Sequence, residues 1–248
     1  MDKKNYYDHY NSENHSLKIF PVKSKPDKSR FKDLHPNLLQ PPFFLIQNMT
    51  TGCGKTTITV NMILRKEFYN QPEEKYFDLF IIISPTIYNC KTSKPLLEYA
   101  DAIYDEYSDN IIDDIIDLQK DNQEEDSDET HILLLVDDML GVPMHKLRYL
   151  SSRYRHYNIS VILNLQSYKS KSSHPILRQN ASGYIIGPVT SNLEFDKMSE
   201  ELSGLFGGKK NFKKLYDEAT RGKYNFLYLD LKKIRAYKNF TKLIWQKE

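Results

Sequence analysis

The sequence predicts an α/β fold with a largely parallel central sheet flanked by helices. Two observations support this fold class. Short apolar runs alternate along the chain with segments of helical periodicity, which is typical of strands joined by crossover helices. Polar residues suited to nucleotide chemistry follow three of these runs, and open parallel sheets bind nucleotides at the carboxyl ends of their strands. We therefore expect one edge of the sheet to gather these residues.

The first predicted strand and the following helix enclose a candidate phosphate-binding loop. Residues 43–57 read FFLIQNMTTGCGKTT, in which 43–47 predicts a strand buried on both faces and 55–69 predicts a helix. This order is that of a P-loop, whose backbone N–H groups surround phosphate oxygens. Lys55 would reach the β- and γ-phosphates, and Thr56 would ligate Mg²⁺. The expected nucleotide-binding residues are Thr51, Gly52, Cys53, Gly54, Lys55, Thr56 and Thr57.

The loop departs from the full P-loop pattern at one position. The pattern G-x-x-x-x-G-K-[ST] has a glycine where this chain has Met49. The residues G-K-T-T could also occur by chance in an ordinary turn that caps an amphipathic helix. The predicted strand before them and the predicted helix after them favour a phosphate loop instead. If the loop wraps a β-phosphate, Thr50 and Thr51 must supply backbone donors without the conformational freedom of that glycine.

The later elements continue the alternation. Apolar runs predict strands at 78–84, 131–138, 159–165, 183–187 and 224–231. Helical patterns predict helices at 93–104, 110–119, 143–154, 192–205 and 209–220. The segment 121–129 is acidic and aperiodic, so we expect a solvated connection rather than a calcium site, because it fits no EF-hand loop.

The chain divides into three parts. Residues 1–40 are polar, basic and interrupted by prolines, so we expect an N-terminal arm with at most a short strand at 17–20. Residues 41–231 form the predicted nucleotide-binding core. Residues 232–248 are expected to form a basic, aromatic C-terminal tail.

Charge and cysteine content restrict the class of protein further. The net charge is only +2, yet 101–129 holds thirteen acids and one lysine, whereas 209–248 holds twelve lysines and arginines and four acids. The basic region suits a polyanionic partner, or it forms a solvated exterior. Two cysteines exclude a disulfide framework and favour a reducing compartment. We expect a soluble protein that is not secreted and does not enter a membrane, because no signal peptide or spanning apolar stretch is visible.

Three residues at strand ends could carry out nucleotide chemistry. Asp137 follows 131–136 where a carboxylate would hold Mg²⁺ beside the phosphate loop, and Asp138 would polarise the attacking water. Gln166 directly follows the predicted strand 159–165, and its amide could bind the γ-phosphate or the water. Helix capping by the aspartates and turn capping by the amide are the structural alternatives. A D-x-x-G match at 138–141 suggests a GTPase only weakly, because no N-K-x-D motif follows.

Arginines could complete the site. In ring ATPases an arginine of a neighbouring subunit neutralises charge on the γ-phosphate in the transition state. Arg153 and Arg155 precede the strand 159–165, and Arg178 lies between Gln166 and the next strand. Each could also be a surface or DNA-contacting residue.

Five blocks in this order resemble the viral DNA-packaging ATPases of the FtsK–HerA superfamily, found in poxviruses, other large eukaryotic DNA viruses and virophages. The blocks are TTGCGKTT, DLFIIISPT, HILLLVDDM, SRYRHYNISVILNLQSY and LRQNASGYIIG. They span roughly 42–231, and the paired aspartates and the run from arginine through histidine and strand to glutamine are their most specific parts.

The resemblance implies a RecA-like additional-strand P-loop NTPase that forms a homo-oligomeric ring and uses ATP and Mg²⁺ to move double-stranded DNA into a preformed capsid. Its expected partners are capsid or portal vertex proteins, and its expected location is the virion or the viral factory in the host-cell cytoplasm. It favours Arg155 over Arg178 as the arginine acting in trans. Another DNA translocase or helicase, a nucleotide or polynucleotide kinase, and a non-hydrolysing assembly scaffold remain as alternatives.

Overall fold

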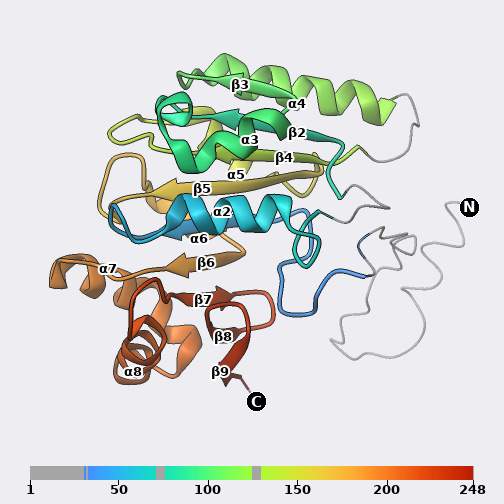
Figure 1. Cartoon of the computed structure of the whole chain (residues 1–248). Helices are drawn as coiled ribbons and strands as arrows, with labels where there is room; N and C mark the ends of the chain where they lie inside the picture. Colours follow the sequence, from blue (N-terminus) through green and yellow to red (C-terminus); the bar gives the residue numbers. More distant parts are fainter. Residues whose placement is uncertain (1–30, 32, 71–75, 125–129, 248) are drawn as a thin grey trace, which may run out of the picture.

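The computed structural model describes residue 31 and residues 33–70, 76–124 and 130–247. In this part of the chain, a nine-stranded sheet in the order β3-β2-β4-β5-β1-β6-β7-β8-β9 lies at the centre, with helices on both faces (Figure 1). The strands from β3 to β6 are parallel, and β6 to β9 pair antiparallel. The structure therefore confirms the α/β fold with a largely parallel sheet.

The strand order identifies the additional-strand arrangement. The strands are β1 (Phe44–Asn48), β2 (Leu79–Ile83), β3 (Ala102–Tyr104), β4 (Ile132–Val136), β5 (Ile159–Leu165), β6 (Gly183–Ile186), β7 (Leu227–Asp230), β8 (Arg235–Lys238) and β9 (Lys242–Gln246). β5 lies between β1, which leads into the phosphate loop, and β4, which leads into the paired aspartates. The three strand ends that carry the predicted site are thus neighbours.

The helices divide between the two faces of the sheet. They are α2 (Lys55–Leu64), α3 (Lys94–Tyr99), α4 (Asp109–Glu124), α5 (His145–Ser151), α6 (Pro175–Asn180), α7 (Asn192–Leu202) and α8 (Lys209–Thr220), with short 3-10 turns η1 (Ile87–Asn89), η2 (Lys91–Ser93) and η3 (Ser203–Phe206). One apolar core joins the sheet to α4–α8, and a second joins it to α2, α3 and part of the segment 31–39.

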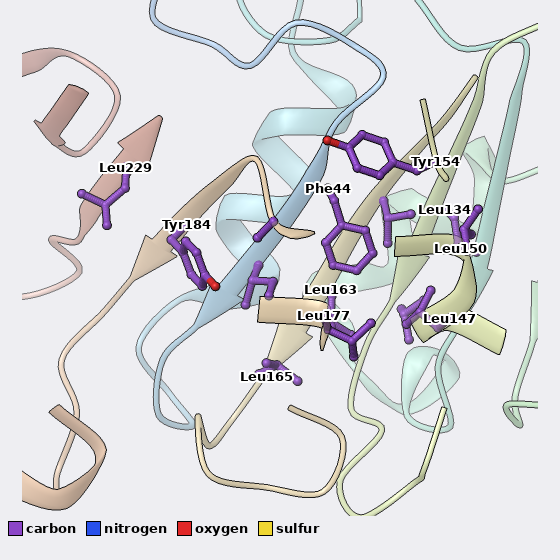
Figure 2. Close-up of a cluster of buried hydrophobic side chains, with 14 of the residues drawn as sticks. Phe44, Leu134, Leu147, Leu150, Tyr154, Leu163, Leu165, Leu177, Tyr184 and Leu229 are labelled. Carbon is purple, nitrogen blue, oxygen red and sulfur yellow. The ribbon is translucent and has the colours of Figure 1, made fainter. Parts of the chain in front are cut away.

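Successive side chains of a strand point to opposite faces, and both faces of this sheet are covered, so the central strands are largely apolar. In β1, Phe44 and Ile46 belong to the first core and Leu45 to the second. Figure 2 shows the first core, where Leu147 of α5 and Leu177 of α6 lie with Phe44. All five residues of β1 are buried, so the strand is fixed from both sides.

One local expectation was wrong, and one helix was missed. The helix expected at 93–104 ends at Tyr99, because Ala100 is extended and 102–104 pairs with β2 as the edge strand β3. Three residues are too few to reveal a strand period. The helix α6 was not expected; Pro175 lies in its first turn, and the His174 side chain accepts a hydrogen bond from the Ile176 N–H.

The described parts of the two expected terminal segments are also more structured than the sequence suggested. The prediction of a tail at 232–248 is wrong for most of this segment. β8 and β9 form an antiparallel hairpin at the edge of the sheet, and Trp245 packs against Phe206 with ring centroids 5.3 Å apart. In the arm, Leu34, Leu38 and Leu39 are buried. The strand expected at 17–20 lies outside the described residues, and so does 125–129; the preceding residues, 121–124, belong to α4.

No helix in the described part of the chain has both the length and the apolar character needed to cross a bilayer.

Candidate active site

The loop between β1 and α2 has the geometry of a phosphate loop. Gly52 and Gly54 have φ angles of 80° and 98°, a region that side chains rarely adopt, and α2 begins directly after Gly54. No other residue of the loop has a positive φ angle. Its helix N-terminus directs free backbone N–H groups towards the cavity.

The structure accounts for Met49, where the loop lacks a glycine. Met49 has no positive φ angle and its side chain is fully buried in the core beneath α2. It packs against Gly187, because a Cβ atom on Gly187 would lie 2.5 Å from the Met49 Cβ. The glycine at the end of the neighbouring strand, β6, makes room for this contact, and Met49 adopts no backbone conformation that would require a glycine.

Lys55 is held inside the loop. Its Nζ atom donates hydrogen bonds to the carbonyl oxygens of Met49, at 2.7 Å, and of Thr50, at 3.4 Å. Burial lowers the pKa of Lys55, although the charges of Asp137, Cys53 and Asp138 act against this effect. A buried ammonium group bonded only to carbonyls is well placed to exchange them for anionic phosphate oxygens.

A cavity of about 550 Å³ lies at the carboxyl edge of the sheet. Every residue expected in the nucleotide and metal sites lines it, together with four residues that we did not predict. The lining residues are Thr51, Gly52, Cys53, Gly54, Lys55, Thr56, Thr57, Ile58, Thr86, Thr92, Asp137, Asp138, Gln166 and Tyr224. Its size suits a nucleotide.

Gln166 joins the phosphate loop to the paired aspartates. Its Nε2 donates to Asp138 Oδ1 at 2.5 Å, and its Oε1 accepts a hydrogen bond from Thr51 Oγ1 at 3.3 Å. Asp138 has a φ angle of 59°, an uncommon conformation for a residue other than glycine. One amide therefore connects the ends of β1, β5 and β4.

Burial is the main influence on the carboxyl group of Asp137, whose pKa is raised above its usual value. Burial raises the pKa of its carboxyl group, a hydrogen bond with Asn164 and the charge of Lys55 lower it, and Asp138 raises it. Asn164, on β5, also donates to Thr59 Oγ1 at 3.4 Å, which in turn donates to the Lys55 carbonyl at 3.2 Å. Sequence reasoning missed Asn164, although a polar residue inside the apolar run ISVILNL was the available signal.

The residues at this edge fit Mg²⁺. The Thr56 hydroxyl and the Asp137 carboxylate line the same cavity and offer only oxygen ligands. No cluster of three or more His, Cys, Asp or Glu side chains in the described residues could hold a metal. Mg²⁺ does not require one, because in phosphoryl-transfer sites it is held by one or two protein groups, phosphates and water. A cation would also favour the ionised form of the buried Asp137.

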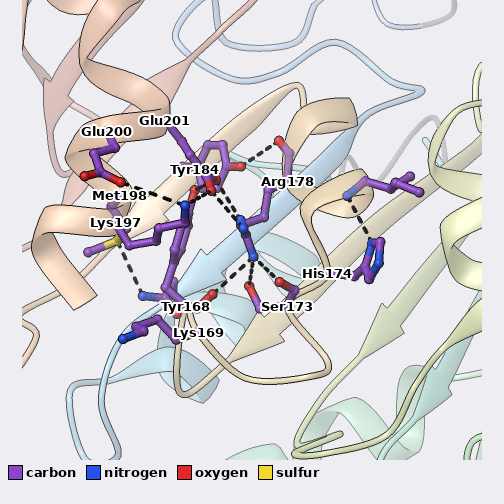
Figure 3. Close-up of polar contacts among 12 residues, drawn as sticks. Tyr168, Lys169, Ser173, His174, Arg178, Tyr184, Lys197, Met198, Glu200 and Glu201 are labelled. Atoms are coloured by element: carbon purple, nitrogen blue, oxygen red, sulfur yellow. Dashed lines mark hydrogen bonds and ion pairs between the residues drawn. The ribbon is translucent and has the colours of Figure 1, made fainter. Parts of the chain in front are cut away.

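Arg178 lies outside the cavity and is enclosed in its own chain. Its Nε and Nη2 atoms donate to the two carboxylate oxygens of Glu201 at 2.7 and 2.8 Å, and Nη1 donates to the carbonyl of Ser173 (Figure 3). The guanidinium of Arg178 also lies over the ring of Tyr168, whose hydroxyl donates to the same Glu201 at 2.8 Å. Only 6% of the Arg178 side chain is exposed, so it is not free to reach another subunit.

Arg155 is exposed and lies just before the amino end of β5. The cavity lies at the other end of this seven-residue strand, about 20 Å away. Arg155 therefore cannot contact the cavity of its own chain. Arg153 is likewise exposed, with its guanidinium carbon 4.0 Å from the ring centroid of Tyr149.

Comparisons with known proteins support this description of the fold. No protein-family model matches the chain, and no curated protein matches its sequence. The genome packaging NTPase B204 from Sulfolobus turreted icosahedral virus 2, in complex with AMP, has a similar structure: TM-score 0.57 and 15% identity over 85% of this chain and 100% of that chain. The DNA-packaging ATPase B204 from Sulfolobus turreted icosahedral virus gives TM-score 0.55 and 12% identity over 85% and 100%.

A third similar structure is the conjugation coupling protein TcpA of pCW3 with ATPγS, with TM-score 0.52 and 13% identity over 76% of this chain and 57% of that chain. Two of the three structures hold a nucleotide. At these identities the similarity establishes a fold, and that fold is the one of P-loop NTPases.

Proposed function

We propose that this chain is an ATPase that translocates double-stranded DNA into a preformed viral capsid during virion assembly. The observation that carries the proposal is the cavity at the sheet edge, where a phosphate loop, two adjacent aspartates and a glutamine converge. The likeness of the fold to packaging ATPases supports the choice of a motor among the many uses of this site. The five sequence blocks support it independently.

Each residue of the cavity has one role in the proposed hydrolysis. The loop N–H groups and Lys55 bind the β- and γ-phosphates, and Thr56 and Asp137 hold Mg²⁺, which supplies charge neutralisation on the phosphate oxygens. Asp138 accepts a proton from the attacking water. The Asp138 side chain is one methylene shorter than the glutamate common at this position. Its Oδ1 atom is held by a hydrogen bond from Gln166 Nε2.

Gln166 is suited to report whether a γ-phosphate is present. Its amide lies at the end of β5 and bridges Thr51, in the loop after β1, and Asp138, after β4. A γ-phosphate oxygen would compete with Asp138 for the Nε2 donor. Binding and release of phosphate would thus move the end of β5 relative to β4, which is the kind of change a motor transmits.

The remaining parts of the proposal concern assembly. An exposed arginine remote from its own cavity must act on a neighbouring subunit if it acts in catalysis, so Arg155 is our candidate for a ring in which subunits share sites. The basic surface of 209–247 would face the DNA phosphates. Capsid or portal vertex proteins would dock the ring, and the protein would work in the virion or in the viral factory of the host-cell cytoplasm.

The test measures ATP hydrolysis with and without duplex DNA for the wild type, Lys55→Ala and Arg155→Ala. We expect DNA to stimulate hydrolysis, the stimulation to weaken steeply with salt, and each variant alone to be inactive. A mixture of the two variants should regain part of the activity, because a Lys55→Ala chain can lend its arginine to an intact cavity. Unchanged hydrolysis by Lys55→Ala would overturn the assignment.

The same preparation separates the alternatives. Phosphate transfer to a nucleoside or polynucleotide acceptor in place of water would identify a kinase. Tight ATP binding without phosphate release would identify a nucleotide-dependent scaffold, and strand separation during hydrolysis would identify a helicase.

A further inference from the structure

We infer that Tyr224 forms the nucleobase subsite of the cavity, with the base stacked on its ring. The inference rests on the proposed nucleotide-binding function and extends it to the part of the ligand that the phosphate loop does not touch. No sequence motif marks this residue. Its role follows from its position, its exposure and the rigidity of its turn.

Tyr224 lies on the side of the phosphate loop away from the catalytic groups. Along the sheet edge, the ends of β4 and β5 carry Asp138 and Gln166, β1 carries the loop, and β6 and β7 follow. β7 is antiparallel to β6, so the turn before it comes to the same edge as the carboxyl ends of the parallel strands. A nucleotide with its γ-phosphate near Asp138 therefore extends its ribose and base towards Tyr224.

The ring is within reach of a nucleotide on the loop. Tyr224 lines the cavity, and a methyl group on Gly54 would lie 3.7 Å from its Cδ1 atom. The residue is 58% exposed, so its ring is accessible to a ligand in the cavity. The Nζ atom of Lys223 lies 4.9 Å from the ring centroid. An open aromatic face beside a phosphate loop suits a base, because every base offers a π-face for stacking.

Hydrogen bonds to neighbouring segments hold the backbone of the turn that carries Tyr224. Tyr224 has a φ angle of 63°, which is strained for a bulky residue. Asn225 Nδ2 donates to the Arg221 carbonyl at 2.7 Å, and Asn225 Oδ1 accepts from Asn239 Nδ2 at 3.1 Å. Asn239 Oδ1 accepts from the Phe226 N–H at 3.1 Å. The turn that joins β8 to β9 therefore anchors the backbone next to Tyr224, which reduces the backbone ordering that binding requires.

The experiment compares binding of ATPγS and inorganic tripolyphosphate, both with Mg²⁺, by calorimetry. We expect Tyr224→Ala to weaken ATPγS binding about tenfold, within the range that loss of one base stack produces, and to leave tripolyphosphate binding unchanged. Tyr224→Phe and Tyr224→Trp should keep the wild-type affinity. The wild type should bind purine triphosphates more tightly than pyrimidine triphosphates, and Tyr224→Ala should lose this preference.

Tyr149→Ala is the matched control. Tyr149 is also exposed and has a cation over its ring, yet it does not line the cavity, so its loss should leave both affinities unchanged. Equal weakening of both ligands by Tyr224→Ala, or no weakening of either, would overturn the subsite while leaving the ATPase proposal standing. Failure of the wild type to bind either ligand would overturn both proposals.

Discussion

Replacing Arg178 with methionine tests whether this side chain supports the fold or the chemistry. The guanidinium is buried and donates to both oxygens of Glu201 and to the Ser173 carbonyl. Methionine keeps much of the volume but removes the guanidinium donors, while Glu201 retains the Tyr168 hydroxyl and the Lys197 ammonium group as partners. Removing one partner of a buried pair costs about 3–5 kcal/mol. Because 27% of the Glu201 side chain is exposed, water recovers part of this, and we expect Arg178→Met to lower the free energy of unfolding by about 3 kcal/mol.

The dependence on pH identifies the pair as the cause. Burial raises the pKa of Glu201, but hydrogen bonds from Arg178 and Tyr168 outweigh it and hold that pKa below its usual value. A carboxyl group with a lowered folded-state pKa stabilises the protein above its unfolded pKa, and this stability is lost as pH falls through the folded pKa. Glu201→Gln should therefore be less stable than the wild type at pH 7, by about 1–2 kcal/mol, and the difference should shrink in acid.

The assay is urea unfolding, followed by circular dichroism, at pH 7 and at a pH below the usual glutamate pKa of about 4.3. Arg178→Met should keep ATP hydrolysis per folded molecule. A variant that unfolds at the wild-type urea concentration but hydrolyses no ATP would refute the structural role and return Arg178 to the catalytic candidates.

Two further predictions concern the cavity. Gly187→Ala should lower the free energy of unfolding by about 1–3 kcal/mol, because its Cβ atom would lie 2.5 Å from that of Met49; in urea unfolding Met49→Ala should offset part of this cost, and strictly additive losses would contradict the contact. Asp138→Asn should lower kcat about 100-fold or more with little change in ATPγS affinity, whereas a variant with wild-type kcat would exclude Asp138 as the base.

The sequence predicted the edge of the sheet that carries the site because local signals and topology agree there. Lys55, Asp137 and Gln166 each follow or end an apolar strand, and parallel strands bring such residues to one edge. The structure places all three in one cavity, while their roles stay predictions. The positive φ angles of Gly52 and Gly54 explain why the loop has glycine at these two positions.

Features that depend on distant pairing were not predictable from the sequence. Tyr224 reaches the cavity only because β7 runs antiparallel to β6, which no local pattern states. Arg178 lies between two predicted strands, a position that suggested an exposed loop residue. Its partner Glu201 is on another helix, and no local pattern links the two. The strands β8 and β9 have only four and five residues and carry lysines, so their short alternation resembled a charged tail.

The position of β1 also determines when the site can form during synthesis. β1 lies between β5 and β6, so both of its partners are made more than a hundred residues after it. At the start of this strand, the backbone N–H groups of Phe43 and Phe44 donate to the hydroxyl groups of Ser160 and Ser182, which are 117 and 138 residues away. A nascent chain that ends before β5 leaves this apolar strand unpaired. Pairing between strands so far apart in the sequence is slow and leaves β1 open to aggregation meanwhile. Most of the chain must therefore be synthesised before the phosphate loop can form.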